Sequence, residues 1–181
     1  MADIPDRKQS LGSRSQVRFG ILLLVIVSVL YGATYQQFRH FDLADPRGAD
    51  DALNYIKMSH GNYSYSPTQQ HRLLIPFMAS LVQKGLHPLI ADEEEVDKLS
   101  FYVVNFVVAC GTALLLFGIL TKLGFVWQLG MLGTFFFLTS RITVLSVGTP
   151  LVDSLYFLAI GLIMYLMLQK KVVLLACLCP L

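Results

Sequence analysis

The sequence predicts an all-α membrane protein with four transmembrane helices, and two observations lead to that class. Of its 181 residues, 55% are hydrophobic and 14% are charged, whereas soluble domains average about 25% charged residues. Four apolar stretches also reach or approach the length of about 20 residues that a helix needs to cross a bilayer. This composition excludes a disordered chain, and the small net charge of +2 argues against nucleic-acid binding.

The first expected span covers residues 19–38 and follows a basic tail, residues 1–18. A basic flank before an apolar run is also typical of a signal peptide, but cleavage requires small residues at two fixed positions. The sequence Tyr31-Gly32-Ala33 and its neighbours fit that requirement poorly. We therefore expect an uncleaved membrane anchor.

Three further spans are expected over residues 101–121, 128–147 and 154–169. Only a tight turn around Lys122-Leu123-Gly124 fits between the second and third spans. Residues 170–181 then form a cytoplasmic turn and an apolar stub that is too short to cross a bilayer. The stub is interpreted as the start of an incomplete fifth helix, which predicts that the chain is truncated.

The orientation of the spans follows from the basic residues that flank them, because cytoplasmic flanks carry an excess of Lys and Arg. Basic residues occur in the N-terminal tail, at Lys122, and at Lys170-Lys171 after the fourth span. Alternating crossings place all three on one side, so the N-terminus is predicted to be cytoplasmic. Residues 39–100 then form a large loop on the opposite side of the membrane.

Two short helices are expected within this outer loop. Residues 50–60 begin with two acids, which a helix start favours, and Gly61 is the predicted stop. Residues 69–86 have an apolar core suited to lying in the membrane interface, with a kink expected at Pro76. The acidic run at residues 92–95, followed by Asp97, is expected to be the solvated start of the second span.

The order of these features resembles a known family. Asp50-Asp51 opens a short helix, a Tyr- and Gly-rich stretch follows, then comes His71-Arg72-Leu-Leu-Ile-Pro-Phe, and later Thr-Pro-Leu-Val-Asp153. This order resembles the N-terminal part of integral-membrane glycosyltransferases of the GT-C fold, which use polyprenyl-phosphate sugars. The resemblance covers about residues 15 to 170. It implies two membrane-surface helices in the first outer loop and a catalytic or metal-binding acid at its start.

Sugar transfer from a lipid phosphate needs a base near the nucleophile and positive charge near the departing phosphate. Asp51, or its neighbour Asp50, is the candidate base or the ligand of a divalent metal such as Mg²⁺ or Mn²⁺. Adjacent residues on a helix point about 100° apart, so one of the two is expected to face the pocket. The alternative role for both acids is stabilisation of the helix start.

Arg72, His71, Arg141 and Asp153 are the candidate substrate-binding residues. An arginine fork suits a phosphate because it donates two parallel hydrogen bonds, although Arg72 could instead reach ordinary lipid headgroups. Arg141 lies inside an expected span, where an ionisable residue is by default a functional candidate. The alternatives are a structural Arg141–Asp153 pair and a helix-capping role for Asp153.

The resemblance implies a glycosyltransferase, or a fragment of one, that acts on the non-cytoplasmic face of the plasma or inner membrane or, in a eukaryote, of the endoplasmic reticulum. Its expected partners are membrane lipid, a polyprenyl-phosphate sugar and a membrane protein that completes the fold. The alternative function is a small non-catalytic subunit or scaffold of a membrane complex. Four scattered histidines do not have the spacing of a zinc site, and the three cysteines lie in apolar stretches as small fillers.

Overall fold

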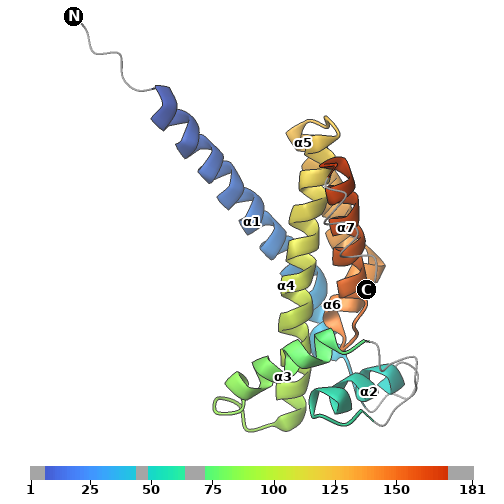
Figure 1. Cartoon of the computed structure of the whole chain (residues 1–181). Coiled ribbons are helices and arrows are strands. Elements are labelled where there is room, and N and C mark those ends of the chain that lie inside the picture. Colours follow the sequence, from blue (N-terminus) through green and yellow to red (C-terminus); the bar gives the residue numbers. More distant parts are fainter. Residues whose placement is uncertain (1–6, 44–48, 64–71, 171–181) are drawn as a thin grey trace, which may run out of the picture.

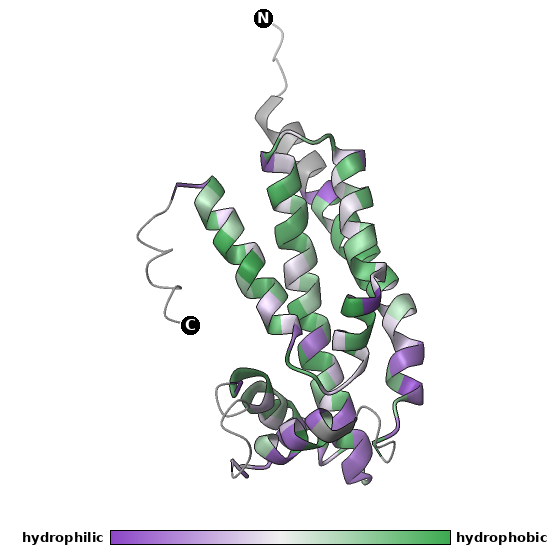
Figure 2. Ribbon diagram, turned by 90° about the vertical axis from the view of Figure 1, so that its right-hand side faces the viewer, coloured by the Kyte–Doolittle hydropathy of each residue, from purple (hydrophilic) through white to green (hydrophobic). Residues whose placement is uncertain are grey.

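The computed structural model describes residues 7–43, 49–63 and 72–170, and every element of secondary structure within these ranges is an α-helix. Five helices form an elongated bundle: α1 (Arg7–His40), α4 (Glu93–Lys122), α5 (Trp127–Thr139), α6 (Arg141–Gly148) and α7 (Ser154–Leu168). Two shorter helices, α2 (Ala49–Ser59) and α3 (Leu74–Leu86), lie across one end of this bundle (Figure 1). Apolar residues predominate along the bundle, and polar residues gather at the end that carries α2 and α3 (Figure 2).

The described residues contain two helices that are long and apolar enough to cross a membrane, residues Gln16–His40 of α1 and all of α4. The number rises to three if α5 and α6 together count as one span. The fourth expected span corresponds to α7, whose 15 residues extend about 22 Å at 1.5 Å per residue. This length is below the bilayer core thickness of about 30 Å, so two or three of the four expected spans qualify as candidate membrane spans by length and composition. The apolar stub after Lys170 lies outside the described residues.

The expected continuous helix over residues 128–147 is instead broken into α5 and α6, which are bent by 55° relative to each other. The break lies at Ser140, whose backbone is extended and whose side chain accepts a hydrogen bond from the backbone N–H of Thr143. Ser140 therefore caps α6 and does not continue α5, a role that serine performs well because its short side chain reaches the free N–H groups of a helix start. The sequence analysis expected one helix over this range and did not predict the break.

Helix α4 is the centre of the molecule and contacts α1, α3, α5, α6 and α7. Its start agrees with the prediction, because Asp92 caps it by accepting a hydrogen bond from the N–H of Glu94 at 3.0 Å. It ends at Lys122, followed by Gly124 with a φ of +90°, which glycine adopts without steric cost. The tight turn that the sequence predicts at residues 122–124 is thus present.

Two apolar clusters hold the helices around α4. Within the bundle, Leu22, Ile26 and Leu30 of α1 pack with residues of α4 that include Ala113 and Phe117. At the end with α2 and α3, the second cluster joins these helices to α4 and to the connection between α6 and α7; its buried members are Tyr55, Ile56, Met58, Ile75, Ala79, Phe101, Val104, Val108 and Val152. This second cluster fixes the outer helices on the bundle.

The outer helices follow the sequence prediction closely, with one correction. Helix α2 begins one residue before the expected start and is followed by Gly61, whose φ of +84° ends it as predicted. Helix α3 begins at Leu74, and the earlier part of the expected helix, residues 69–71, lies outside the described residues. Pro76 causes no kink, because it is the third residue of α3, where a missing N–H interrupts no helical hydrogen bond.

Candidate functional site

Arg72 joins side chains from two other segments at the end of the bundle that carries α2 and α3. Its Nη1 donates a hydrogen bond of 3.0 Å to the hydroxyl of Tyr55 and lies 3.8 Å from Oδ1 of Asp153. Its guanidinium carbon also lies 5.4 Å from the centre of the Tyr156 ring, within the range of a cation–π contact. We call Tyr55, Arg72, Asp153 and Tyr156 the Arg72 cluster.

Packing below the cluster fixes these side chains. Tyr55 belongs to α2, is 1% exposed, and packs in the second apolar cluster together with Val152. Because Val152 directly precedes Asp153, its burial brings the start of α7 next to α2. Arg72 itself lies two residues before α3, so the cluster draws on three elements that are well separated in the sequence.

The charges around Tyr55 show which acids lie nearby. Burial raises the pKa of Tyr55, the hydrogen bond and positive charge of Arg72 lower it, and the negative charges of Asp51 and Asp153 raise it further. Asp51 precedes Tyr55 by four residues on α2, a spacing that places two side chains on one face of a helix. Asp51 is exposed, so the face of α2 that contains Tyr55 presents a carboxylate to the surface beside the Arg72 cluster.

The structure brings together three of the six predicted site residues. Arg72 and Asp153 are in direct contact, and Asp51 is close enough for its charge to act on Tyr55. Asp50 lies in the first turn of α2, but its side chain is outside the described part of the chain. His71 also lies outside the described residues.

Arg141 is placed away from this group. It is the first residue of α6, directly after the break at Ser140, and its side chain is exposed. The ion-pair partner of Asp153 in the described part of the chain is Arg72, not Arg141. Asp153 does occupy the capping position of α7, but its side chain makes no capping hydrogen bond and turns to Arg72 instead.

A second polar group joins the C-terminal end of α2 to α3 and α4, and the sequence analysis did not predict it. Asp97 is 9% exposed, and its carboxylate oxygens lie 3.0 and 3.1 Å from Nε2 of His60. Gln83 donates to Asp97 at 2.8 Å and to Ser59 at 2.9 Å. The expectation that Asp97 is solvated is therefore wrong, because α2 and α3 cover it and supply its hydrogen-bond donors.

The described residues contain no group of three or more His, Cys, Asp and Glu side chains that could hold a metal ion. Of the two candidate metal ligands, Asp51 belongs to no such group, and the side chain of Asp50 lies outside the described residues. The chemistry that the Arg72 cluster supports is the binding of an anion. A guanidinium held by a tyrosine hydroxyl and a tyrosine ring keeps a fixed orientation, and it is the group that best matches phosphate or carboxylate geometry.

Sequence reasoning missed the two tyrosines of the Arg72 cluster. Tyr55 carries a usable signal, since it is four residues from Asp51 on a predicted helix. Tyr156 carries none, because it follows an expected span boundary where tyrosine is common as an interface anchor. Their pairing with Arg72 depends on contacts between α2, the start of α3 and α7.

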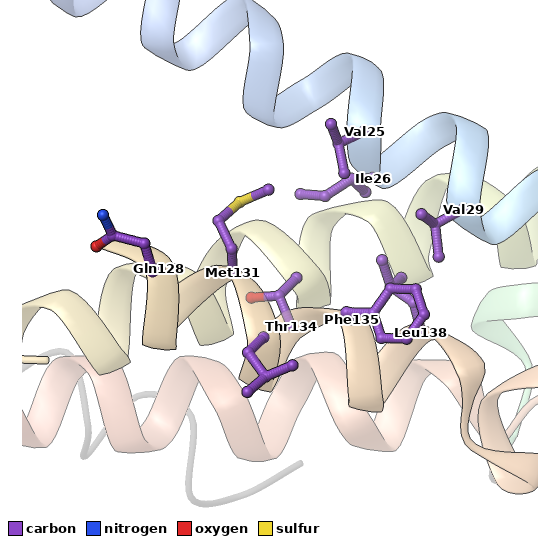
Figure 3. A pocket seen from close by; sticks show the side chains of 9 residues that line it. Val25, Ile26, Val29, Gln128, Met131, Thr134, Phe135 and Leu138 are labelled. Atoms are coloured by element: carbon purple, nitrogen blue, oxygen red, sulfur yellow. The ribbon is translucent and has the colours of Figure 1, made fainter. Parts of the chain in front are cut away.

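A separate apolar groove of about 290 Å³ lies between α1 and α5. Figure 3 shows its side chains directed toward one another from the two helices, which diverge from this point (Figure 1). Val25, Ile26 and Val29 come from α1, and Met131, Phe135 and Leu138 are among those from α5. Of its two polar lining residues, Gln128 and Thr134, Thr134 donates its hydroxyl to the backbone oxygen of Gly130 at 2.9 Å, so the wall of the groove is mostly apolar.

Comparison of the chain with protein-family models, with curated proteins and with solved structures gives no match.

Proposed function

We propose that this chain is an integral-membrane glycosyltransferase of the GT-C kind, or a part of one, that transfers sugar from a polyprenyl-phosphate donor. The observation that carries the proposal is the Arg72 cluster with Asp51 beside it at one end of an apolar bundle. In this position an arginine that binds a lipid phosphate and a carboxylate that activates a nucleophile lie together at the level of the lipid headgroups.

The contacts of Arg72 suit this role. Both polar contacts in the described part of the chain involve Nη1, so the remaining N–H donors of the guanidinium are available for a phosphate. Asp153 is 3.8 Å away and its side chain is 45% exposed, which makes the ion pair weak enough for an incoming phosphate to displace. Tyr55 stays protonated at neutral pH, since its pKa is raised, and it holds Arg72 in place.

The topology belongs to the same proposal. Four spans with a cytoplasmic N-terminus place α2, α3 and the Arg72 cluster on the non-cytoplasmic side of a plasma, inner or endoplasmic-reticulum membrane. In that arrangement the bilayer is locally thin around α7, and a partner membrane protein completes the lipid pocket. Asp51, or Asp50, acts as the base or holds a divalent metal.

The test is sugar transfer by membranes that contain the chain, supplied with a panel of radiolabelled polyprenyl-phosphate sugars. Asp51→Asn is expected to lower the rate about 10²- to 10⁴-fold, the usual contribution of a general base. Arg72→Gln is expected to raise the donor KM more than it lowers kcat. Glu95→Gln, which neutralises an exposed acid at the start of α4, is the matched control. Full activity in Asp50→Asn, Asp51→Asn and the double variant would overturn the catalytic assignment.

One observation favours the alternative of a non-catalytic subunit. Helix α3 exposes Leu74, Phe77 and Leu81 to 50%, 57% and 53%, and their spacing of three and four residues places them on one face. This face suits a membrane surface or a partner helix. If Phe77→Ser and Leu81→Ser abolish assembly into a larger complex while both acids can be replaced without effect, the subunit function is correct and the enzyme function is not.

A further inference from the structure

We propose that Asn105 of α4 is a positioning residue that holds Asp153 and Tyr156 against Arg72. The significance of this role for catalysis rests on the proposed function, whereas the positioning itself is a claim about geometry. Asn105 lies inside the bundle and is fully buried, with 0% of its surface exposed. It therefore acts on the Arg72 cluster only through the residues that it contacts.

The hydrogen bonds of Asn105 join it to residues before and after Asp153 in the sequence. Its Nδ2 donates to the backbone oxygen of Leu151 at 2.9 Å and to that of Thr149 at 3.3 Å. Its Oδ1 accepts a short hydrogen bond from Oγ of Ser154. Both donors and the acceptor of the amide are thus used, and they fix the chain on both sides of Asp153.

A buried polar residue in a helix does not by itself make such contacts. Thr112, two turns further along α4 and 5% exposed, donates its hydroxyl to the backbone oxygen of Val108 in the same helix. Asn105 instead connects α4 to the α6–α7 connection and to the first residue of α7. Because Tyr156 follows Ser154 by two residues in the first turn of α7, the same contacts set the direction of its ring toward Arg72.

The alternative is that Asn105 only satisfies buried carbonyl groups, which cost free energy when they lack a donor in an apolar environment. A purely stabilising role predicts that any variant of equal stability gives the same distance between positions 72 and 153. A positioning role predicts that this distance depends on Asn105 in particular. A distance measurement therefore separates the two roles.

The experiment uses the full chain in detergent, with Cys110, Cys177 and Cys179 replaced by alanine, and with Arg72→Cys and Asp153→Cys introduced. The rate at which a short bifunctional methanethiosulfonate joins the two new thiols reports how closely and firmly positions 72 and 153 are held. Asn105→Ser removes the Nδ2 donors that hold the α6–α7 connection. Ser154→Ala removes only the hydrogen bond to Oδ1 of Asn105, and it is the test variant to use if Asn105→Ser does not fold. Thr112→Val and Ile119→Ala, both on α4 and away from the connection, are the controls for altered polarity and lost stability.

The positioning role predicts that cross-linking slows about tenfold in Asn105→Ser and a few-fold in Ser154→Ala, as expected for the loss of buried hydrogen bonds. Thr112→Val and Ile119→Ala are expected to cross-link at the parent rate. Equal rates in all five proteins, or the same slowing in Ile119→Ala as in Asn105→Ser, would overturn the proposal.

A second arm tests the link to function in chains that keep Arg72 and Asp153. Binding of undecaprenyl phosphate is expected to weaken in Asn105→Ser and to stay unchanged in Thr112→Val. If the parent chain does not bind this lipid while cross-linking still depends on Asn105, the proposed function fails and the positioning role stands. If the parent binds the lipid and cross-linking is independent of Asn105, the positioning role fails alone.

Discussion

Tyr55 combines a buried ring with a hydroxyl that accepts a hydrogen bond from Arg72. The ring contributes to the apolar cluster under α2, and the hydroxyl sets the orientation of the guanidinium. Burial and the nearby acids raise the pKa of Tyr55 above its usual value of 10.0, because a buried phenolate without enough positive charge is unfavourable. The residue therefore links the stability of the outer helices to the geometry of the site.

This raised pKa gives a testable pH dependence. The unfolded chain releases the Tyr55 proton at a lower pH than the folded chain does, so the contribution of Tyr55 to stability is complete below about pH 10 and is lost as the pH rises through the folded pKa. Thermal unfolding in detergent is expected to show a steeper loss of stability above about pH 10 in the parent than in Tyr55→Phe. Parallel pH profiles for the two proteins would contradict the assignment.

Asp97 is a second residue whose role the fold decides. Its carboxylate receives hydrogen bonds from Gln83 of α3 and contacts His60 directly after α2, so one side chain of α4 holds both outer helices. Removing it takes away one of the two acceptors of the buried Gln83 amide nitrogen, which keeps Ser59 as the other, and a buried donor that loses its acceptor costs more than the lost bond itself.

Asp97→Ala is expected to lower the free energy of unfolding by about 1–3 kcal/mol and to speed proteolysis and hydrogen exchange in α2 and α3. The matched control is Glu94→Ala, which removes an exposed ion pair of 2.8 Å with Lys98 and is expected to cost at most about 0.5 kcal/mol. If the two variants lose the same stability, the network around Asp97 does not hold the outer helices.

At the scale of elements, α1 and α6 approach each other closely at Gly148. A Cβ atom at this position would lie 2.6 and 2.7 Å from Cγ and Cβ of Gln37 and 3.2 Å from the backbone nitrogen of Phe38. These contacts involve the base of a side chain and the backbone, so relief would require a shift of α1 or α6. The approach also places α1 beside the α6–α7 connection that Asn105 holds.

Gly148→Ala is therefore expected to destabilise the chain by about 1–3 kcal/mol, the usual cost of overpacking. Gly20→Ala on α1, where a Cβ meets nothing within 4 Å, is the control and is expected to be neutral or to stabilise by up to about 1 kcal/mol. Thermal unfolding of both variants in the same detergent measures the difference. An unchanged midpoint for Gly148→Ala would show that α1 and α6 are not in fixed contact.

The whole molecule separates into an apolar bundle and a polar end that carries α2, α3 and the Arg72 cluster (Figure 2). In a membrane, the bundle of such a molecule lies across the bilayer, which leaves the outer helices in water or at the interface on one side. The turn at Lys122 then lies on the opposite side, at the far end of α4, and basic residues favour the cytoplasmic side for this turn.

This topology is tested by labelling single cysteines in a cysteine-free chain in intact cells. Glu93→Cys at the start of α4 is expected to react with a membrane-impermeant maleimide, and Leu123→Cys only after the membrane is opened. Both positions are exposed, so access to the reagent decides the result. Labelling of Leu123→Cys in intact cells would reverse the proposed orientation.

Composition and hydropathy determined the elements of this protein well. An apolar run with polar ends has few alternatives to a helix, because every backbone N–H and C=O group in a bilayer needs a partner within its own segment. The sequence therefore predicted α1, α4 and α7, the end of α2 at Gly61 and the turn after Lys122. The acidic run at residues 92–95 also marked the start of α4, since acids at a helix start are a signal that lies within the local sequence.

Tertiary structure alone decided what the polar residues do. Asp97 has the same local sequence signal as the solvated acids before it, and only the packing of α2 and α3 makes it a buried hydrogen-bond acceptor. Asp153 has the signal of a helix cap, and contact with Arg72 turns it away from that role. The physical reason is that helix formation is governed by periodicity along the chain, whereas a hydrogen bond between distant segments depends on distances that no local pattern encodes.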